Sequence, residues 1–324
     1  MNSPTLQSLV PEEMKAQLSA RLQPSHTPIW AHWEDFAIRY LRTGKSEGTV
    51  RNVRDAIKFI LNHSQLVSIE DFNDQRKLED VLYEIMQSRH FSHSTFNTYI
   101  KNLKTYFIWL KRQELIAVNN LKNIPKYRET PKKQPTLNIA QVNVVVGHIM
   151  SRRQTRLERL RNIFFIDLLR LTAARPAELL QLTDDNITSD LEGIALTIHG
   201  IKQKGKPRLY ALKGYAKDSY LTYINYKKTE RPTEKKLFVS MSKRDGWTHQ
   251  GVNQLMKRLS KELGFRVNCY GFRRSVATSL DEMELSLDEI GGYLGHTRRS
   301  TTLRYIQEST KRTMRASDIM NKIY

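Results

Sequence analysis

A charged, proline-containing segment at residues 124–135 is the sequence feature that most constrains how this chain of 324 residues can fold. Proline lacks a backbone N–H and restricts the residue before it, so Pro125, Pro131 and Pro135 exclude a continuous helix or strand there. The segment also has no apolar periodicity. We therefore predict an extended linker over residues 124–136 that joins two domains.

The residues before the linker have the apolar spacing of helices. The periodic positions are Val50, Val53, Ile57, Ile60 and Leu61, then Leu78, Val81, Leu82, Ile85 and Met86, then Phe96, Tyr99, Ile100, Leu103, Phe107 and Leu110. Together with a helix that begins near Thr27 and ends before Gly44, they predict a bundle of four amphipathic helices over residues 27–123. Residues 1–26 are expected to form an N-terminal extension with one short helix.

The second predicted domain, residues 137–324, is mostly helical and contains one β episode. Asn138 is placed to cap its first helix. Residues 194–201 are rich in β-branched side chains and are followed, across a turn, by residues 208–212, which predicts a β-hairpin. Residues 237–239 are expected to add a third short strand. The predicted fold class is thus mainly α with a small β-sheet.

The charge balance indicates a polyanionic partner. Lys and Arg number 53 and Asp and Glu 33, which gives a formal net charge of +20, and nucleic acid is the simplest partner for such a chain. The single cysteine, Cys269, excludes an internal disulfide framework and a multi-cysteine zinc site. No apolar run approaches the ~20 residues of a membrane span, and residues 1–7 lack the order of a secretory signal. We expect a cytoplasmic protein that does not bind membranes.

Several basic groups are candidates for contacts with phosphates. They are Lys101, Lys104 and Lys111, beside Tyr99 and Tyr106, and Lys204 and Lys206 in the hairpin turn. An arginine-rich run over residues 152–161 has the same two interpretations as these lysines, namely a solvated face or a phosphate-contacting face.

Three short segments of the second domain contain candidate catalytic residues. Arg175 lies between small residues in a sharp turn, and Glu178, three residues later, is placed to hold its guanidinium. Tyr270 and Arg273 open a second segment, Tyr-Gly-Phe-Arg-Arg-Ser-Val-Ala-Thr. A third segment contains Leu-Gly-His at residues 294–296, nine residues before Tyr305. Each segment alone is weak, but the three in this order form a specific pattern.

This pattern resembles the tyrosine recombinase (phage integrase) family, over about residues 27–324. The resemblance implies a helical core-binding domain followed by a mixed α+β catalytic domain. It assigns catalytic roles to Arg175, Lys202, Tyr270, Arg273, His296 and Tyr305. The hairpin lysine could instead be Lys204, and we favour Lys202 because it lies just after the strand. Tyr270 departs from the family pattern, which most often has histidine there, but a phenol can still hydrogen-bond a phosphate oxygen.

The resemblance also implies a reaction. Tyr305 would attack a DNA phosphodiester, form a 3′-phosphotyrosine and release the 5′ oxygen, without a metal or ATP. Arg175 and Arg273 would bind the phosphate, His296 would hydrogen-bond it or help to deprotonate Tyr305, and Lys202 would protonate the leaving oxygen. The expected partners are double-stranded DNA with a specific recombination site and further copies of the chain in a tetramer. In such an assembly, residues 311–324 would pack on a neighbouring copy; the alternative is that they pack back on their own domain.

Two alternatives remain at this point. One is a sequence-specific DNA-binding protein with an impaired active centre, for which Tyr270 is the only support. The other is a DNA-relaxing enzyme similar to type IB topoisomerases, which share the tyrosine chemistry. The modest length and the linker favour a recombinase.

Overall fold

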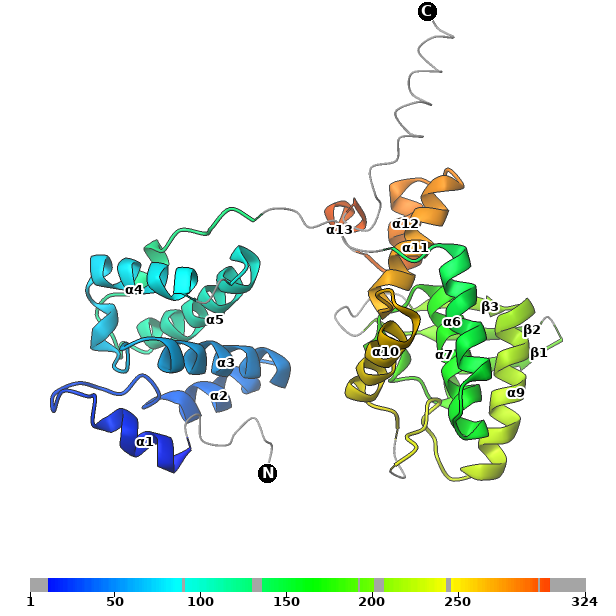
Figure 1. Cartoon of the computed structure of the whole chain (residues 1–324), viewed down its shortest axis with the longest axis horizontal. Helices are drawn as coiled ribbons and strands as arrows, with labels where there is room; N and C mark the ends of the chain where they lie inside the picture. The colour runs from blue at the N-terminus through cyan, green and yellow to red at the C-terminus, as the bar shows by residue number, and fades with distance from the viewer. Residues whose placement is uncertain are drawn as a thin grey trace, which may run out of the picture. The chain divides into compact units, whose positions relative to one another are not determined.

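The chain divides into two compact units, Met1–Lys132 and Lys133–Tyr324, in the computed structural model (Figure 1). The structure describes residues 11–88, 91–129, 136–191, 193–200, 207–242, 246–296 and 298–303. Over these residues, no helix has both the length and the apolar character that crossing a membrane requires.

The first unit is helical, as predicted. It consists of α1 (Glu12–Ser19), α2 (Trp33–Arg42), α3 (Glu47–His63), α4 (Gln75–Ser88) and α5 (His93–Arg112), with 3-10 turns η1 (Glu70–Phe72) and η2 (Asn120–Asn123). Serine side chains begin two of the helices: Ser46 accepts a hydrogen bond from the Thr49 N–H, and Ser92 accepts one from the Thr95 N–H. The buried faces of α2 to α5 contain the apolar residues that the helical spacing indicated.

Residues on both sides of the predicted bundle also pack on it. Leu18 of α1 is buried in the same core, and Arg21 donates to the Ser64 carbonyl at 2.6 Å. Ile124 is buried there as well, and Tyr127 packs against the core from outside. The ranges that the sequence assigned to an extension and a linker therefore include residues of the first unit's hydrophobic core.

The second unit combines helices with one small sheet. Its elements are α6 (Ile139–Ser151), α7 (Arg156–Thr172), α8 (Pro176–Leu179), η3 (Asp184–Asn186), β1 (Ile187–Asp190), β2 (Gly193–Ile198), β3 (Arg208–Leu212), α9 (Gly214–Glu230), α10 (His249–Leu263), α11 (Cys269–Glu282), α12 (Leu287–Leu294) and α13 (Arg299–Leu303). Helix α7 packs against α6, α9 and α11. Asn138 caps α6 as predicted, because its side chain accepts from the Gln141 N–H at 2.8 Å.

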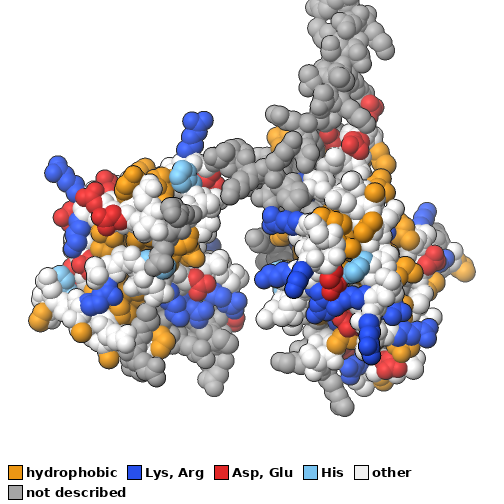
Figure 2. All heavy atoms as spheres, in the orientation of Figure 1, with side chains coloured by type: hydrophobic (Ala, Val, Ile, Leu, Met, Phe, Trp, Pro, Cys, Tyr) orange, Lys and Arg blue, Asp and Glu red, His pale blue; other side chains and the backbone are white. Residues whose placement is uncertain are grey.

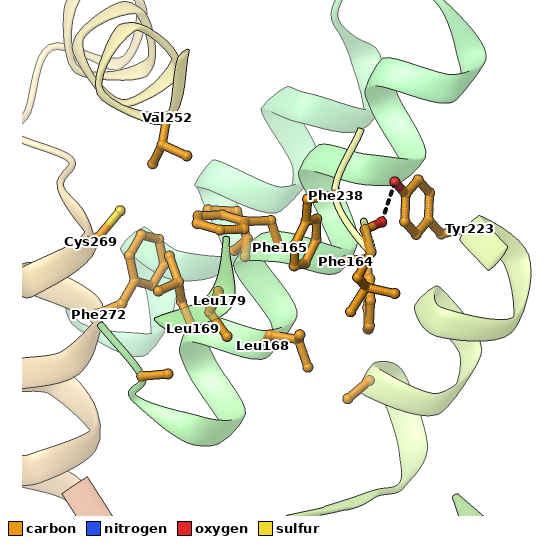
Figure 3. Packing of buried hydrophobic residues seen from close by; sticks show 14 of the residues in the cluster. Phe164, Phe165, Leu168, Leu169, Leu179, Tyr223, Phe238, Val252, Cys269 and Phe272 are labelled. Carbon is orange, nitrogen blue, oxygen red and sulfur yellow. Dashed lines mark hydrogen bonds between the residues drawn. The ribbon is translucent and has the colours of Figure 1, made fainter. Parts of the chain in front are cut away.

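Aromatic side chains fill the centre of the second unit. Phe164 and Phe165 of α7 pack against Phe238, and Tyr223 and Phe272 belong to the same cluster (Figure 3). All five side chains are buried. This core fixes α7, and the end of α7 leads directly into the turn that contains Arg175.

The sheet confirms the predicted hairpin and corrects the predicted third strand. Strands β2 and β3 pair antiparallel, with Leu196 opposite Tyr210, and β1 pairs with the other edge of β2. Residues 237–239 form no strand of this sheet. Their backbone groups bond elsewhere: Leu237 N–H donates to the Leu182 carbonyl, and the Leu237 carbonyl accepts from the Tyr223 hydroxyl. Val239 forms an isolated antiparallel bridge with Gly246, and the other backbone groups are satisfied by a loop and a side chain, so the segment is buried without belonging to the sheet.

Within the arginine-rich run, Arg161 fits neither of the two interpretations. Its side chain is only 4% exposed, so it is neither a solvated group nor a phosphate contact. Its guanidinium lies 3.9 Å from the centre of the Trp247 ring and donates to the Val239 carbonyl at 2.9 Å. This arginine therefore stabilises the core of the second unit.

Candidate active site

Arg175 is placed by a turn between two helices. Helix α7 ends at Thr172, and Ala173, which is fully buried, adopts a left-handed conformation with φ of 50°. Arg175 is then the N-cap of α8, with Pro176 at the first helical position. Its backbone N–H donates to Glu178 Oε2 at 3.0 Å and its Nη1 to Glu178 Oε1 at 2.9 Å. The predicted Arg175–Glu178 pair is thus confirmed.

Glu178 holds a second arginine as well. Its carboxylate, 1% exposed, accepts a hydrogen bond from Arg208 Nη2 at 2.6 Å. Burial by itself would raise the pKa of Glu178, but hydrogen bonding from the Arg175 backbone and the charge of Arg208 outweigh it and hold the pKa below its usual value. The carboxylate is therefore ionised and lies between two guanidinium groups.

Arg273 connects the turn of the first motif with the third motif. Helix α11 begins after Asn268, which caps it, and this places Arg273 one turn into the helix with a side chain that is 1% exposed. Its guanidinium donates to the carbonyls of Ala173 and Leu294. It also donates to His296 Nε2 at 2.7 Å.

His296 is held as a neutral imidazole. Its Nε2 accepts from Arg273, so the ring proton is on Nδ1, which donates to Thr302 Oγ1 at 3.0 Å. Burial, followed by the charges of Arg273, Arg175 and Arg208, lowers the pKa of His296 to about 4. The imidazole is thus available at neutral pH as a hydrogen-bond acceptor.

Gly295 has two physical reasons to be glycine. Its φ is +67°, a conformation that side chains disfavour. A Cβ on this residue would also lie 3.0 Å from Arg208 Nε. The Leu-Gly-His motif therefore leaves room for the Arg208 guanidinium directly beside the backbone that leads into His296.

The structure brings together three of the predicted catalytic residues, Arg175, Arg273 and His296. Tyr270 is the second residue of α11, three residues before Arg273, and is 49% exposed. The remaining predictions, Lys202, Lys204, Lys206 and Tyr305, lie outside the described residues.

Sequence reasoning missed several members of the cluster. Arg208, Tyr210 and Tyr293 belong to no recognised motif. The Tyr210 hydroxyl donates to the Tyr293 carbonyl at 2.6 Å, and the Tyr293 hydroxyl donates to the Leu171 carbonyl. A signal was present only for Arg208, as a charged residue that begins an otherwise apolar strand.

The three lysines predicted on the first unit have different environments, and Lys111 donates from Nζ to the Ala117 carbonyl at 2.7 Å. Lys101 is exposed on α5. Lys104 is partly buried, donates from Nζ to the Ile124 carbonyl at 2.7 Å, and has a pKa lowered by burial. Tyr106 is fully buried, which corrects its predicted place on a DNA-facing surface, and Tyr99 stacks on Phe59 with ring centres 4.2 Å apart.

The cluster is suited to an anionic group with developing charge. The charges of three guanidinium groups, those of Arg175, Arg208 and Arg273, and of one carboxylate, Glu178, act on His296, so two positive charges remain in excess. Guanidinium groups donate to two oxygens of a phosphate at once. Donors that are fixed before the reaction lower its barrier by stabilising the charge that develops.

Comparison with known families defines the class of protein to which this site belongs. Residues 143–312 match the family model described as the phage integrase family. The matched region spans the three site motifs. The chain therefore belongs to the phage integrase family, the tyrosine recombinases, whose members are site-specific recombination enzymes.

Particular relatives are similar over most of their length. The tyrosine recombinase XerD of Oceanobacillus iheyensis is 26% identical over 84% of this chain and 92% of its own. The tyrosine recombinase XerC of Leptospira interrogans is 20% identical over 85% of this chain and 88% of its own.

Solved structures share the fold. The Tn1549 transposon integrase in complex with a circular intermediate DNA matches with a TM-score of 0.69 and 17% identity, over 93% of this chain and all of that one. The XerH site-specific recombinase bound to a palindromic difH substrate matches with a TM-score of 0.67 and 18% identity, over 99% of this chain and 98% of that one.

Proposed function

We propose that this protein cuts and rejoins double-stranded DNA at a specific recombination site through a 3′-phosphotyrosine at Tyr305, without a metal or ATP. The observation that carries the proposal is the convergence of Arg175, Arg273 and a neutral His296 in one cluster. The membership of the chain in a family of tyrosine recombinases supports it.

In the proposed step, the phenolic oxygen of Tyr305 attacks the phosphorus. The new bond joins Tyr305 to the 3′ phosphate, and the bond from phosphorus to the 5′ oxygen breaks. The tyrosine proton goes to an acceptor, and the leaving oxygen takes a proton from the hairpin lysine, Lys202 or in the alternative Lys204. Attack by the freed 5′ hydroxyl of another strand reverses the step, so no external energy source is needed.

Arg175, Arg273 and His296 have complementary roles in this step. The two arginines donate to the non-bridging oxygens, where negative charge develops in the transition state. His296 is neutral at pH 7, so Nε2 can accept the proton of Tyr305, or share it through a hydrogen bond, once a phosphate competes for Arg273. The exposed phenol of Tyr270 is proposed to donate a further hydrogen bond to the phosphate.

We propose double-stranded DNA as the partner, in the cytoplasm. Lys and Arg side chains gather on the face of the second unit seen in Figure 2, and the whole chain carries a net charge of +20. The proposed contacts with the DNA backbone are Lys101, Lys104, Lys204 and Lys206. The DNA-bound Tn1549 integrase and XerH support this choice of partner.

We further propose a tetramer on DNA, in which residues 311–324 of one copy bind the next. An apolar groove of about 750 Å³ on the second unit supports this assembly. Its lining includes Leu137, Ile139, Phe272 and Met283. The apolar residues available to fill it are Met314, Ile319, Met320 and Ile323.

A covalent trapping experiment tests the proposed function. The protein is incubated with a nicked candidate site to which it binds, and a protease-sensitive protein–DNA adduct is expected. Tyr305→Phe should bind the same DNA and give no adduct. A wild-type protein that binds the site without forming an adduct would instead be a DNA-binding protein only. Loss of supercoils without strand exchange between two sites would indicate a relaxing enzyme.

A further inference from the structure

Arg208 is an arginine at the start of β3 that no sequence motif assigned to the site. Its side chain is 12% exposed, so most of it is buried in the second unit. The guanidinium donates to Glu178 Oε2 at 2.6 Å, to the Leu294 carbonyl at 3.1 Å and to the Tyr210 hydroxyl at 3.2 Å. A buried arginine with this many partners is fixed in one orientation.

The partners of Arg208 belong to the segments that contain the proposed catalytic groups. Glu178 is the residue that holds Arg175. The Leu294 carbonyl also accepts from Arg273 at 2.7 Å, and it lies two residues before His296. Arg208 itself directly follows the hairpin turn with the candidate lysines. One side chain therefore connects α8, β3 and the end of α12.

The charge of Arg208 also affects the electrostatic field that Arg175 and Glu178 exert on a phosphate. If Glu178 faced Arg175 alone, the ion pair would be neutral and its field at a phosphate would be small. Because Glu178 is shared with Arg208, the carboxylate stays ionised and holds Arg175 while the pair of arginines keeps one positive charge in excess. The side chain of Arg175 is 28% exposed and can still reach an incoming phosphate.

We propose that Arg208 is a positioning residue for DNA cleavage: it fixes Glu178, and through Glu178 the guanidinium of Arg175, against the backbone that leads into His296. The inference rests on the proposed cleavage reaction. It gives Arg208 no contact with the DNA.

The test measures the rate of adduct formation on a nicked site in a single turnover at saturating protein, together with the DNA dissociation constant and the melting temperature. The variants are Arg208→Lys, Arg175→Lys and the double variant. The matched control is Arg161→Lys, the same substitution at a buried arginine whose partners, Trp247 and Val239, lie outside the site.

Arg208→Lys should slow cleavage about 10- to 100-fold with an unchanged dissociation constant, because a lysine has one donor centre and cannot bond Glu178 and the Leu294 carbonyl in the same geometry. In the Arg175→Lys background, the further loss should stay below about threefold, because the group that Arg208 positions is already impaired. Arg161→Lys should lower the melting temperature without a comparable loss of rate.

Fully multiplicative losses in the double variant, or equal rate losses in Arg208→Lys and Arg161→Lys, would overturn the inference and leave the proposed function intact. If Arg208→Lys does not fold, the comparison uses Arg208→Gln, Glu178→Gln and the double variant Arg208→Gln/Glu178→Gln. Because Arg208 is proposed to act through Glu178, the double variant should cleave within about threefold of the slower single variant, and fully multiplicative losses overturn the inference. A wild-type protein that gives no adduct on bound DNA ends both proposals.

Discussion

At the residue scale, the protonation of His296 ties the site to the stability of the second unit. The folded protein lowers the pKa of His296 from the usual 6.5 to about 4, so between these values the unfolded chain binds this proton more readily. The contribution of His296 to the free energy of unfolding should therefore be complete above about pH 6.5 and decline as the pH falls toward 4.

Urea unfolding of wild type and His296→Gln at pH 7 and pH 4.5 measures this contribution. Other groups titrate in both proteins, so the quantity of interest is the difference between the two proteins at each pH. The wild type should lose more stability on acidification than His296→Gln. An equal loss in both would show that His296 is not held neutral by its neighbours.

The types and order of residues predicted which motif residues lie together better than they predicted the hydrogen bonds among them. Arg175, Arg273 and His296 could be found from their motifs, and the bond from Arg175 to Glu178 from helical spacing. Arg208 could not, because its partners lie 30 and 86 residues away in the chain. A long-range partner of a buried charge depends on the packing of several elements, which local patterns do not encode.

At the element scale, the sequence between β2 and β3 contains two candidates for the general acid, Lys202 and Lys204, and an experiment can distinguish them. Lys202→Ala should slow cleavage of an ordinary phosphodiester about 10²- to 10⁴-fold, because the 5′ oxygen then leaves unprotonated. A 5′-bridging sulfur should restore the rate, since a thiol has a pKa of about 8.5 and its anion leaves without a proton. Single-turnover cleavage of the two substrates measures the rescue.

Lys204→Ala is the matched control for this hairpin experiment. This substitution removes a lysine two positions further along the sequence. The Lys204→Ala variant should cleave the phosphodiester and the 5′-sulfur substrate at similar rates. Sulfur rescue of Lys204→Ala, with none for Lys202→Ala, would reverse the assignment.

The elements themselves show where sequence patterns work and where they fail. Helices α2 to α5 of the first unit follow from apolar spacing because each presents one face to a shared core. The third strand was misplaced because residues 237–239 are as apolar as a buried strand, whereas β1 is exposed over three of its four residues. β1 is defined by its backbone pairing with β2, and the side chains of β1 show no pattern that predicts this pairing.

At the scale of the whole molecule, the excess of basic residues should make DNA binding strongly salt-dependent. The logarithm of the association constant should fall linearly with the logarithm of salt concentration, by about 0.9 per neutralised phosphate. Lys101→Gln should reduce this slope by about 0.9. Lys104→Gln should change it less, because Nζ of Lys104 is bound to the Ile124 carbonyl. Fluorescence anisotropy titrations at several salt concentrations measure both slopes, and equal slopes for the two variants would contradict the distinction.

Peptide mapping of the covalent adduct tests the central claim most directly. Trypsin cleaves after Arg304 and Lys311, so the account predicts that residues 305–311 are recovered with a nucleotide on Tyr305, joined through a 3′ phosphate, and that the released strand ends in a 5′ hydroxyl. A nucleotide on any other residue, or a 5′ phosphate linkage, would contradict it.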